Sequence, residues 1–186
     1  MQPSAPSAQT PDIHSTSTGS AVIALSNPKS PINVGAVLRA CACFGHDQVY
    51  YTGTRFEVAD RFRADTRNAR DKVALNACAD LTALRQPHQQ LVAVDYCVGA
   101  TALPQFEHPE HAIYVFGPED GSVEQSVIDA ADHVVFIPTH TSLNLAVTVN
   151  LVLYDRIAKQ PALDTPDDFI KTSRDVNNRL RIKTAE

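Results

Sequence analysis

The stretch FIPTHTSLNLAVTVNLVLYD, residues 136–155, begins as a strand and continues as a helix. Its start completes the apolar run HVVFI (133–137), and its end has the nearly continuous apolar character of a helix that is buried on most sides. Between the two elements lie Pro138, three hydroxyl residues, His140 and Asn144. A plain turn would be enough to join two buried elements, so this polar run indicates a functional loop.

Other apolar runs follow the same pattern. Together with 133–137, they predict five strands, at 21–25, 48–52, 91–96, 112–116 and 133–137. The runs are rich in Val and Ile and nearly continuous rather than alternating, which is typical of strands covered on both faces.

Helical patterns lie between these strands. One covers residues 33–45, with Asn33 placed to cap it and Gly45 to end it. A second covers 122–132, where Ser122 and Gln125 form a capping box, and a third runs from about 142 until Pro161 ends it. Alternating strands and helices predict an α/β fold, with a mostly parallel open sheet and helices on both of its faces.

The length of 186 residues suits one domain. We expect a disordered tail at 1–20, rich in Ser, Thr, Pro and Ala, then a folded domain at 21–160 and a C-terminal extension at 161–186. No apolar run reaches the ~18 residues of a membrane span and no signal peptide opens the chain, so we expect no membrane association. The four cysteines are typical of small core residues in a reducing compartment, which favours the cytoplasm.

The net charge of −5 argues mildly against nucleic acid, but the charges are unevenly distributed. Residues 104–133 hold seven acids and no Lys or Arg, whereas 54–72 hold six basic residues against four acids. The basic run RFRADTRNARDKV (61–73) is either a solvated helix face or an RNA backbone groove. The groove would consist of Arg61, Arg63, Arg67, Arg70 and Lys72. The tail RDVNNRLRIK (174–183) leaves the same two interpretations open.

Polar or glycine-rich segments follow four of the five predicted strands. They are SNPKSPINVG (26–35), DYCVGA (95–100), GPEDGS (117–122) and PTHTSLN (138–144). Ligands of open parallel sheets bind beyond the carboxyl ends of the strands, so these segments predict a site at that edge. The run HPEH (108–111) is expected to be a surface loop, and no metal site is expected because no further ligands stand at suitable spacing.

Three segments together resemble the motifs of the SpoU branch of the SPOUT RNA methyltransferases. They are NPKSPINVGAVLRACACFG (27–45), VFGPEDG (115–121) and IPTHTSLNLAVTVNLVLYD (137–155), and their order and spacing also agree over residues 21–159. The resemblance implies a C-terminal trefoil knot, S-adenosylmethionine as the methyl donor, and a ribose 2′-hydroxyl of tRNA or rRNA as the acceptor. It also implies a homodimer that packs the helices of the first and third motifs at its interface.

The resemblance also assigns site residues. The implied cofactor contacts are Tyr96, Cys97, Gly117, Ile137, Ser142 and Leu143. The implied catalytic set is Arg39, Asn33, Glu119, Ser142 and Asn144. A guanidinium keeps its proton near neutral pH, so we expect Arg39 to orient the ribose hydroxyl and stabilise negative charge rather than to act as a base. Glu119 can orient an arginine, whereas Asp120 lies off the motif.

Three alternatives remain in view. A base-methylating enzyme of the same fold is disfavoured by Arg39 together with SLN (142–144), a combination typical of the ribose-methylating branch. A catalytically silent RNA-binding dimer would be expected to lack Arg39, Glu119 or the glycine turn, and all are present. A generic nucleotide-binding α/β protein is disfavoured because the chain has no phosphate loop.

Overall fold

Seven parallel strands form the sheet of the computed structural model, which describes residues 19–60, 73–160, 167–173 and 177–183. Across the sheet the order is β3-β2-β1-β6-β4-β7-β5. The strands are β1 (Ala21–Leu25), β2 (Gln48–Tyr51), β3 (Ala74–Ala77), β4 (Gln90–Val94), β5 (Thr101–Ala102), β6 (Ala112–Phe116) and β7 (His133–Phe136). The prediction of an α/β fold with a mostly parallel sheet is confirmed.

Five α-helices and two 3-10 turns accompany the strands in the described ranges. The helices are α1 (Pro31–Cys43), α2 (Arg55–Asp60), α4 (Gln125–Ala130), α5 (Leu145–Ala158) and α6 (Asp167–Ser173), and the 3-10 turns are η1 (Thr82–Leu84) and η2 (Leu103–Gln105). The chain divides into two units. Thr18–Gln160 holds the sheet, and the other unit comprises Met1–Ser17 and Pro161–Glu186, of which the structure describes α6 and residues 177–183.

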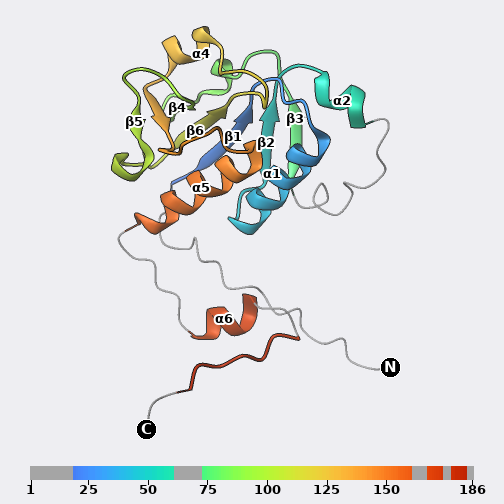
Figure 1. Cartoon of the computed structure of the whole chain (residues 1–186), viewed down its shortest axis with the longest axis vertical. Coiled ribbons are helices and arrows are strands. Elements are labelled where there is room, and N and C mark those ends of the chain that lie inside the picture. The colour runs from blue at the N-terminus through green and yellow to red at the C-terminus, as the bar shows by residue number, and fades with distance from the viewer. Residues whose placement is uncertain (1–18, 61–72, 161–166, 174–176, 184–186) are drawn as a thin grey trace. The chain divides into compact units, whose positions relative to one another are not determined.

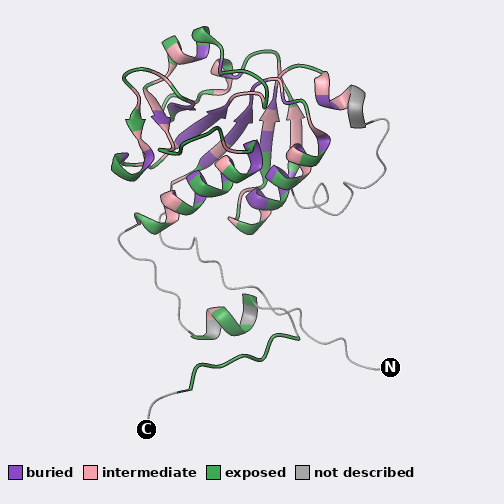
Figure 2. Ribbon diagram, viewed as in Figure 1, coloured by how far each residue is buried: buried purple, intermediate pink, exposed green. Residues whose placement is uncertain are grey.

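Helices cover both faces of the sheet. Successive residues of β1 point to opposite faces, so Ile23 and Leu25 belong to one apolar cluster and Ala24 to another. The first cluster includes buried residues of α1 and α5, which lie side by side across one face (Figure 1). The second includes Val127 of α4 on the opposite face. Figure 2 shows buried central strands, while the outward sides of α1 and α5 are exposed.

The two longest helices begin at side-chain caps. Helix α1 starts at Pro31, and the hydroxyl of Ser30 accepts from the Asn33 amide at 3.5 Å. The helix therefore begins earlier than predicted, and the expectation that Asn33 caps it is wrong. The predicted stop is confirmed, because Gly45 has φ 76° and the next amide closes a bond to the Cys41 carbonyl at 2.8 Å.

Helix α5 is capped by Asn144, whose Oδ1 accepts from the amides of Ala146 at 2.9 Å and Val147 at 3.4 Å. Residues 138–144 before it form the predicted polar loop, and α5 begins at Leu145, three residues later than the predicted start at about 142.

The helix predicted at 122–132 is shorter than expected. Helix α4 begins at Gln125, and its N-cap Glu124 makes no side-chain capping bond, so the predicted capping box of Ser122 and Gln125 is wrong. The physical reason is that the amide of Val123 donates to the Asp95 carboxylate at 2.6 Å. This bond keeps 122–124 in the loop, and the Gln125 side chain instead donates to Asp129 at 2.7 Å.

Two edge strands were not predicted. β3 has the sequence ALNA, in which Ala and Asn are weak strand formers, and β5 is two residues long. The cysteine prediction is confirmed for Cys41, which is buried, and wrong for Cys43, which is exposed. Burial raises the pKa of the Cys41 thiol to about 12. Among the described residues, no helix is both long and apolar enough to span a bilayer.

Candidate functional site

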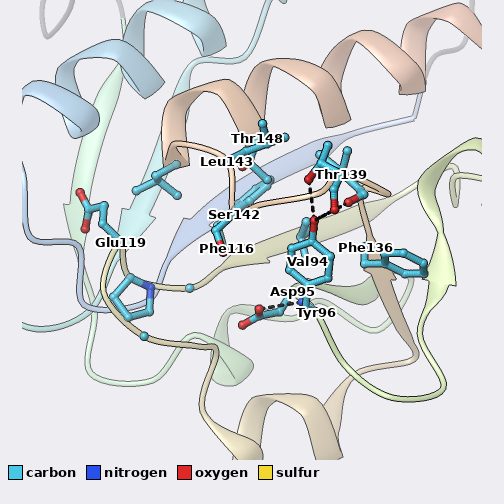
Figure 3. Close-up of a pocket in the computed structure, with 15 residues that line it drawn as sticks. Val94, Asp95, Tyr96, Phe116, Glu119, Phe136, Thr139, Ser142, Leu143 and Thr148 are labelled. Atoms are coloured by element: carbon cyan, nitrogen blue, oxygen red, sulfur yellow. Dashed lines mark hydrogen bonds between the residues drawn. The ribbon is translucent and has the colours of Figure 1, made fainter.

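A pocket opens at the carboxyl ends of β4, β6 and β7. Three segments line it: residues 94–96 at the end of β4, residues 116–119 and 121 at the end of β6, and residues within 136–148 around the loop between β7 and α5. Figure 3 shows their side chains converging on this pocket. The site therefore lies where the sequence predicted it, at the edge where ligands of open parallel sheets bind.

Two consecutive residues after β4 tie the three lining segments together. The carboxylate of Asp95 accepts from the amide of Tyr96 at 2.7 Å and from that of Val123 at 2.6 Å. The Tyr96 hydroxyl lies 2.9 Å from the Ile137 carbonyl oxygen and also contacts Thr139 (Figure 3). Asp95 thus fastens the 117–123 loop to β4, and Tyr96 fastens the 137–142 loop.

The glycine turn after β6 carries Glu119. Its carboxylate accepts from the backbone amides of Lys29 at 2.8 Å and Ser30 at 3.0 Å, and from Nδ2 of Asn33 at 2.8 Å. Partial burial acts to raise the pKa of Glu119, but these hydrogen bonds outweigh it and hold the pKa below its usual range. Glu119 is therefore an ionised acceptor that fixes the start of α1 against the turn.

Asn33 continues this network to α5. Its Oδ1 accepts from Nδ2 of Asn144 at 3.0 Å, and Asn144 in turn caps α5. The chain of contacts Glu119–Asn33–Asn144 therefore joins the segments that follow β6, β1 and β7, and it combines three residues of the predicted catalytic set.

The neighbouring acid, Asp120, binds two cations. Its carboxylate lies 2.9 and 2.7 Å from one guanidinium nitrogen of Arg55 and 3.1 Å from the Lys29 ammonium. The hydrogen bonds from Arg55 and then Lys29 lower the pKa of Asp120 to about 2. In the described part of the chain, the arginine expected beside Glu119 lies beside Asp120 instead.

The structure brings most predicted cofactor contacts together. Tyr96, Gly117, Ile137, Ser142 and Leu143 line the pocket, as does Glu119 from the catalytic set. Cys97 does not line it, and its thiol is directed to the Val98 carbonyl.

Arg39 also lies outside the pocket lining. It is exposed on α1, and its side chain makes no hydrogen bond or ion pair with the described residues. The predicted RNA contacts at 61, 63, 67, 70 and 72 lie outside the described residues, as does part of the 174–183 tail.

Sequence reasoning missed Asp95, Thr139 and Thr148, which also line the pocket. The acid at the end of a buried strand was a usable signal for Asp95, whereas hydroxyls in a loop or a helix are too common to single out. His140, in the same polar loop, is exposed.

The prediction that HPEH forms a surface loop is wrong for His108. Its ring lies 2.7 Å from the Tyr114 hydroxyl and 2.9 Å from the Asp155 carboxylate, and its side chain is 5% exposed. Burial lowers its pKa against the opposing effect of Asp155, with Arg156 and Lys159 adding to the decrease. The described residues contain no group of three or more His, Cys, Asp or Glu side chains that could hold a metal ion.

Comparison with known proteins gives consistent matches. The model of the SpoU rRNA Methylase family matches residues 20–154. The chain is 31% identical over 150 residues to a tRNA (cytidine(34)-2'-O)-methyltransferase of Beijerinckia indica subsp. indica, which covers 76% of this chain and 93% of the relative.

Two solved structures share the fold. The TrmH/SpoU tRNA modifying enzyme of A. aeolicus has a TM-score of 0.62 at 20% identity, with 75% of each chain covered. The SpoU methyltransferase AviRb of Streptomyces viridochromogenes, in complex with AdoMet, has a TM-score of 0.63 at 20% identity, with 76% of this chain and 58% of that chain covered.

Proposed function

Because this chain belongs to the SpoU rRNA methylase family, we propose that it is an S-adenosylmethionine-dependent methyltransferase acting on a ribose 2′-hydroxyl of RNA. The curated relative is named for 2′-O-methylation of cytidine in tRNA, which favours tRNA as the substrate. The observation that carries the proposal is the pocket itself, since the second and third family motifs form two of its three lining segments.

The residues of the pocket fit S-adenosylmethionine. Phe116, Ile137 and Leu143 offer apolar surface for an adenine ring, and Ser142 offers a hydroxyl for the polar groups. When bound, the cofactor supplies an electrophilic methyl group on a sulfonium. The residues of the chain provide the rest of the chemistry: they exclude water, hold the methyl donor, and position the hydroxyl that attacks.

We assign Arg39 to the ribose side of this reaction. Its guanidinium orients the hydroxyl and stabilises the negative charge that develops as the oxygen loses its proton. Glu119 accepts a hydrogen bond from the Asn33 side chain, and Asn144 donates one to the same side chain. These three residues therefore position the helix that carries Arg39.

A second copy of the chain would complete the site. Arg39 does not line the pocket of its own chain, and it shares the outward side of α1 with the exposed Ile32. The exposed apolar residues Val147, Leu151 and Tyr154 lie on one side of the adjacent α5. This apolar surface supports a homodimer built on α1 and α5, as the family implies. Light scattering at micromolar concentration is expected to give twice the chain mass, and a strictly monomeric species would contradict the proposal.

Three further assignments belong to the same proposal. The C-terminal part of the sheet is a trefoil knot, which is supported by the sheet order, since β6 lies between β1 and β4 while β7 lies beyond β4. Residues 21–160 are the methyltransferase domain, between a tail at 1–20 and an extension at 161–186, supported by the family match to 20–154. The protein acts in the cytoplasm, which is supported by its four free cysteines.

Mass spectrometry of nucleosides tests the proposed function. Total tRNA and rRNA from cells with and without the gene would be digested and compared. We expect one 2′-O-methylnucleoside to disappear from the tRNA of the deletion strain and to return when the gene is restored. Identical nucleoside profiles would contradict the proposed reaction.

A further inference from the structure

Two cations from different loops meet at one carboxylate beside the pocket. Lys29 follows β1, Arg55 is the first residue of α2 after β2, and Asp120 lies in the turn after β6. These three strands are neighbours in the order β2-β1-β6, so the loops that follow them lie next to one another at the carboxyl edge. Asp120 contacts both cations through the ion pairs described above.

This cluster lies just outside the cofactor pocket. Glu119 and Gly121, the residues on either side of Asp120, line the pocket, whereas Asp120, Lys29 and Arg55 do not. A small ligand held inside the pocket is therefore not the partner that the two cations fit. A larger ligand that extends out of the pocket past Glu119 and Gly121 would reach the cluster.

Chemistry and exposure both point to an anion. Lys29 and Arg55 both contact Asp120, with the ionised Glu119 next to it, so an anion binding here would take the place of Asp120. The side chains of Lys29 and Asp120 are 60% and 45% exposed. Exposed ion pairs contribute little to folding stability, so stability alone does not account for the arrangement. Arg55 contacts both oxygens of the carboxylate, and a phosphate offers the same arrangement of oxygens to a guanidinium.

Arg55 has a side-chain contact that does not depend on Asp120, and Lys29 has a backbone contact that does not depend on it. The backbone amide of Lys29 donates a hydrogen bond to the Glu119 carboxylate at 2.8 Å, which fixes the backbone there. The Arg55 guanidinium also donates to the carbonyl of Asn27 at 3.5 Å. An anion that replaced Asp120 would therefore meet an Arg55 guanidinium that is still bonded to Asn27, and a Lys29 side chain whose backbone is fixed nearby.

We propose that Lys29 and Arg55 bind a backbone phosphate of the RNA strand whose ribose enters the pocket, and that Asp120 occupies this phosphate site until the RNA displaces it. The inference rests on the proposed RNA methylation. In RNA the carbon bearing the 2′-hydroxyl is bonded to the carbon bearing the 3′-phosphate, so a ribose at the pocket brings a phosphate to its mouth. S-adenosylmethionine has no phosphate, and its only anionic group is a carboxylate.

RNA binding to the full-length protein tests the site. The dissociation constant of a fluorescein-labelled tRNA transcript would be measured by anisotropy with S-adenosylhomocysteine present, over a series of salt concentrations. For Arg55→Gln and Lys29→Gln we expect about 5- to 10-fold weaker binding and a logarithmic salt slope smaller by about 0.7 to 1, the signature of one lost phosphate contact. Affinity for S-adenosylhomocysteine should be unchanged.

The decisive variant is Asp120→Asn, which removes the competing charge at nearly constant shape. A phosphate site predicts about 2- to 3-fold tighter RNA binding, because the phosphate no longer displaces a carboxylate, together with a steeper salt slope. A purely structural ion cluster predicts weaker RNA binding for Asp120→Asn and Arg55→Gln alike, and that result would overturn the proposal. A parallel loss of S-adenosylhomocysteine affinity would also overturn it, because the anion would then be the cofactor carboxylate.

Arg85→Gln is the matched control. Arg85 pairs with Asp132 at 3.0 Å in another exposed ion pair, but this one lies before β4 and β7, at the amino edge of the sheet. The RNA affinity of the Arg85→Gln variant should equal that of the wild type. A loss of RNA affinity as large as that of Arg55→Gln would contradict a local phosphate site. The assay measures RNA binding and not methylation, so the phosphate site and the proposed function can fail separately. Wild-type protein that binds RNA without methylating it would refute the proposed function, and the variants would still decide whether the phosphate site exists.

Discussion

Replacing Tyr96 by Phe tests whether the loop after β4 shapes the cofactor pocket. The Tyr96 hydroxyl lies 2.9 Å from the carbonyl oxygen of Ile137 and 3.2 Å from that of Thr139, and it also contacts the Thr139 hydroxyl. The substitution removes these contacts and keeps the ring, which packs at 5.9 Å from Phe136. Only the connection between the β4 loop and the 137–142 loop changes.

The size of the effect follows from counting protons. The Thr139 hydroxyl donates its proton to the Thr141 carbonyl at 2.8 Å, so in its contact with Tyr96 it is the acceptor. The Tyr96 hydroxyl has a single proton and therefore donates one hydrogen bond at a time. One such bond is worth about 0.5–1.5 kcal/mol, which corresponds to about 2- to 12-fold in a dissociation constant. Tyr96 is 52% exposed, so water can replace part of the bond. We therefore expect a loss of about 2- to 5-fold in affinity for S-adenosylhomocysteine, at the lower end of that range.

Isothermal titration calorimetry with S-adenosylhomocysteine measures this loss directly. Tyr50→Phe is the matched control, since the Tyr50 hydroxyl also makes one hydrogen bond, to Gln48 at 2.8 Å, but Tyr50 does not line the pocket. Both variants should lose less than ~1 kcal/mol of stability, or at most about 4 °C in Tm. Unchanged affinity for Tyr96→Phe, or an equal loss for Tyr50→Phe, would refute the reasoning.

Three further perturbations test other parts of the account. Gly117→Ala would bring a Cβ within 2.9 Å of the Val123 amide nitrogen, so we expect calorimetry to show at least about 10-fold weaker cofactor binding. In the control variant Gly121→Ala the Cβ meets only a Pro118 side-chain atom at 3.3 Å, so this variant should bind the cofactor nearly normally. Equal affinities of the two variants would contradict this expectation. Arg39→Lys should lower kcat by about 100-fold with unchanged cofactor affinity, because an ammonium cannot reproduce the guanidinium fork, and near-full activity would rule out this role. Burial holds the folded-state pKa of His108 below its ordinary value, so the unfolded chain binds the proton first and the free energy of unfolding should fall as pH drops below about 6.5. Urea unfolding at pH 7.5 and 5 measures this, and a His108→Gln variant with the same decrease would contradict the assignment.

The central sheet could be predicted because its strands are buried on both faces. Runs such as AVIAL and AIYVF contain almost no polar residue, and in the structure every residue of β6 is buried. β3 could not be found in this way, because an edge strand needs only the ladder to β2 and its sequence ALNA is half-exposed or exposed throughout. The sequence therefore predicts the middle of the sheet better than its edges.

The position of the site was predictable, but its internal contacts were not. Motif residues such as Glu119 and Asn33 carry a recognisable pattern, and they do meet. Asp95 acts on the backbone amide of Val123, and a backbone donor 28 residues away leaves no trace in the residue types. The same bond shortened α4 and removed the predicted capping box. Likewise, Arg55 and Asp120 are 65 residues apart and meet only because β2, β1 and β6 are neighbours in the sheet.

Methyl transfer in vitro tests the central claim most directly. Purified full-length protein would be incubated with S-adenosylmethionine carrying a labelled methyl group and with total tRNA, and the methylated nucleotide located by mass spectrometry. A matched synthetic RNA with 2′-deoxyribose at the located nucleotide would then replace the natural substrate. The account predicts one labelled 2′-O-methylnucleotide in the natural RNA and no label at that nucleotide in the deoxy version. Label that persists in the deoxy RNA would place the methyl group on a base and contradict ribose methylation.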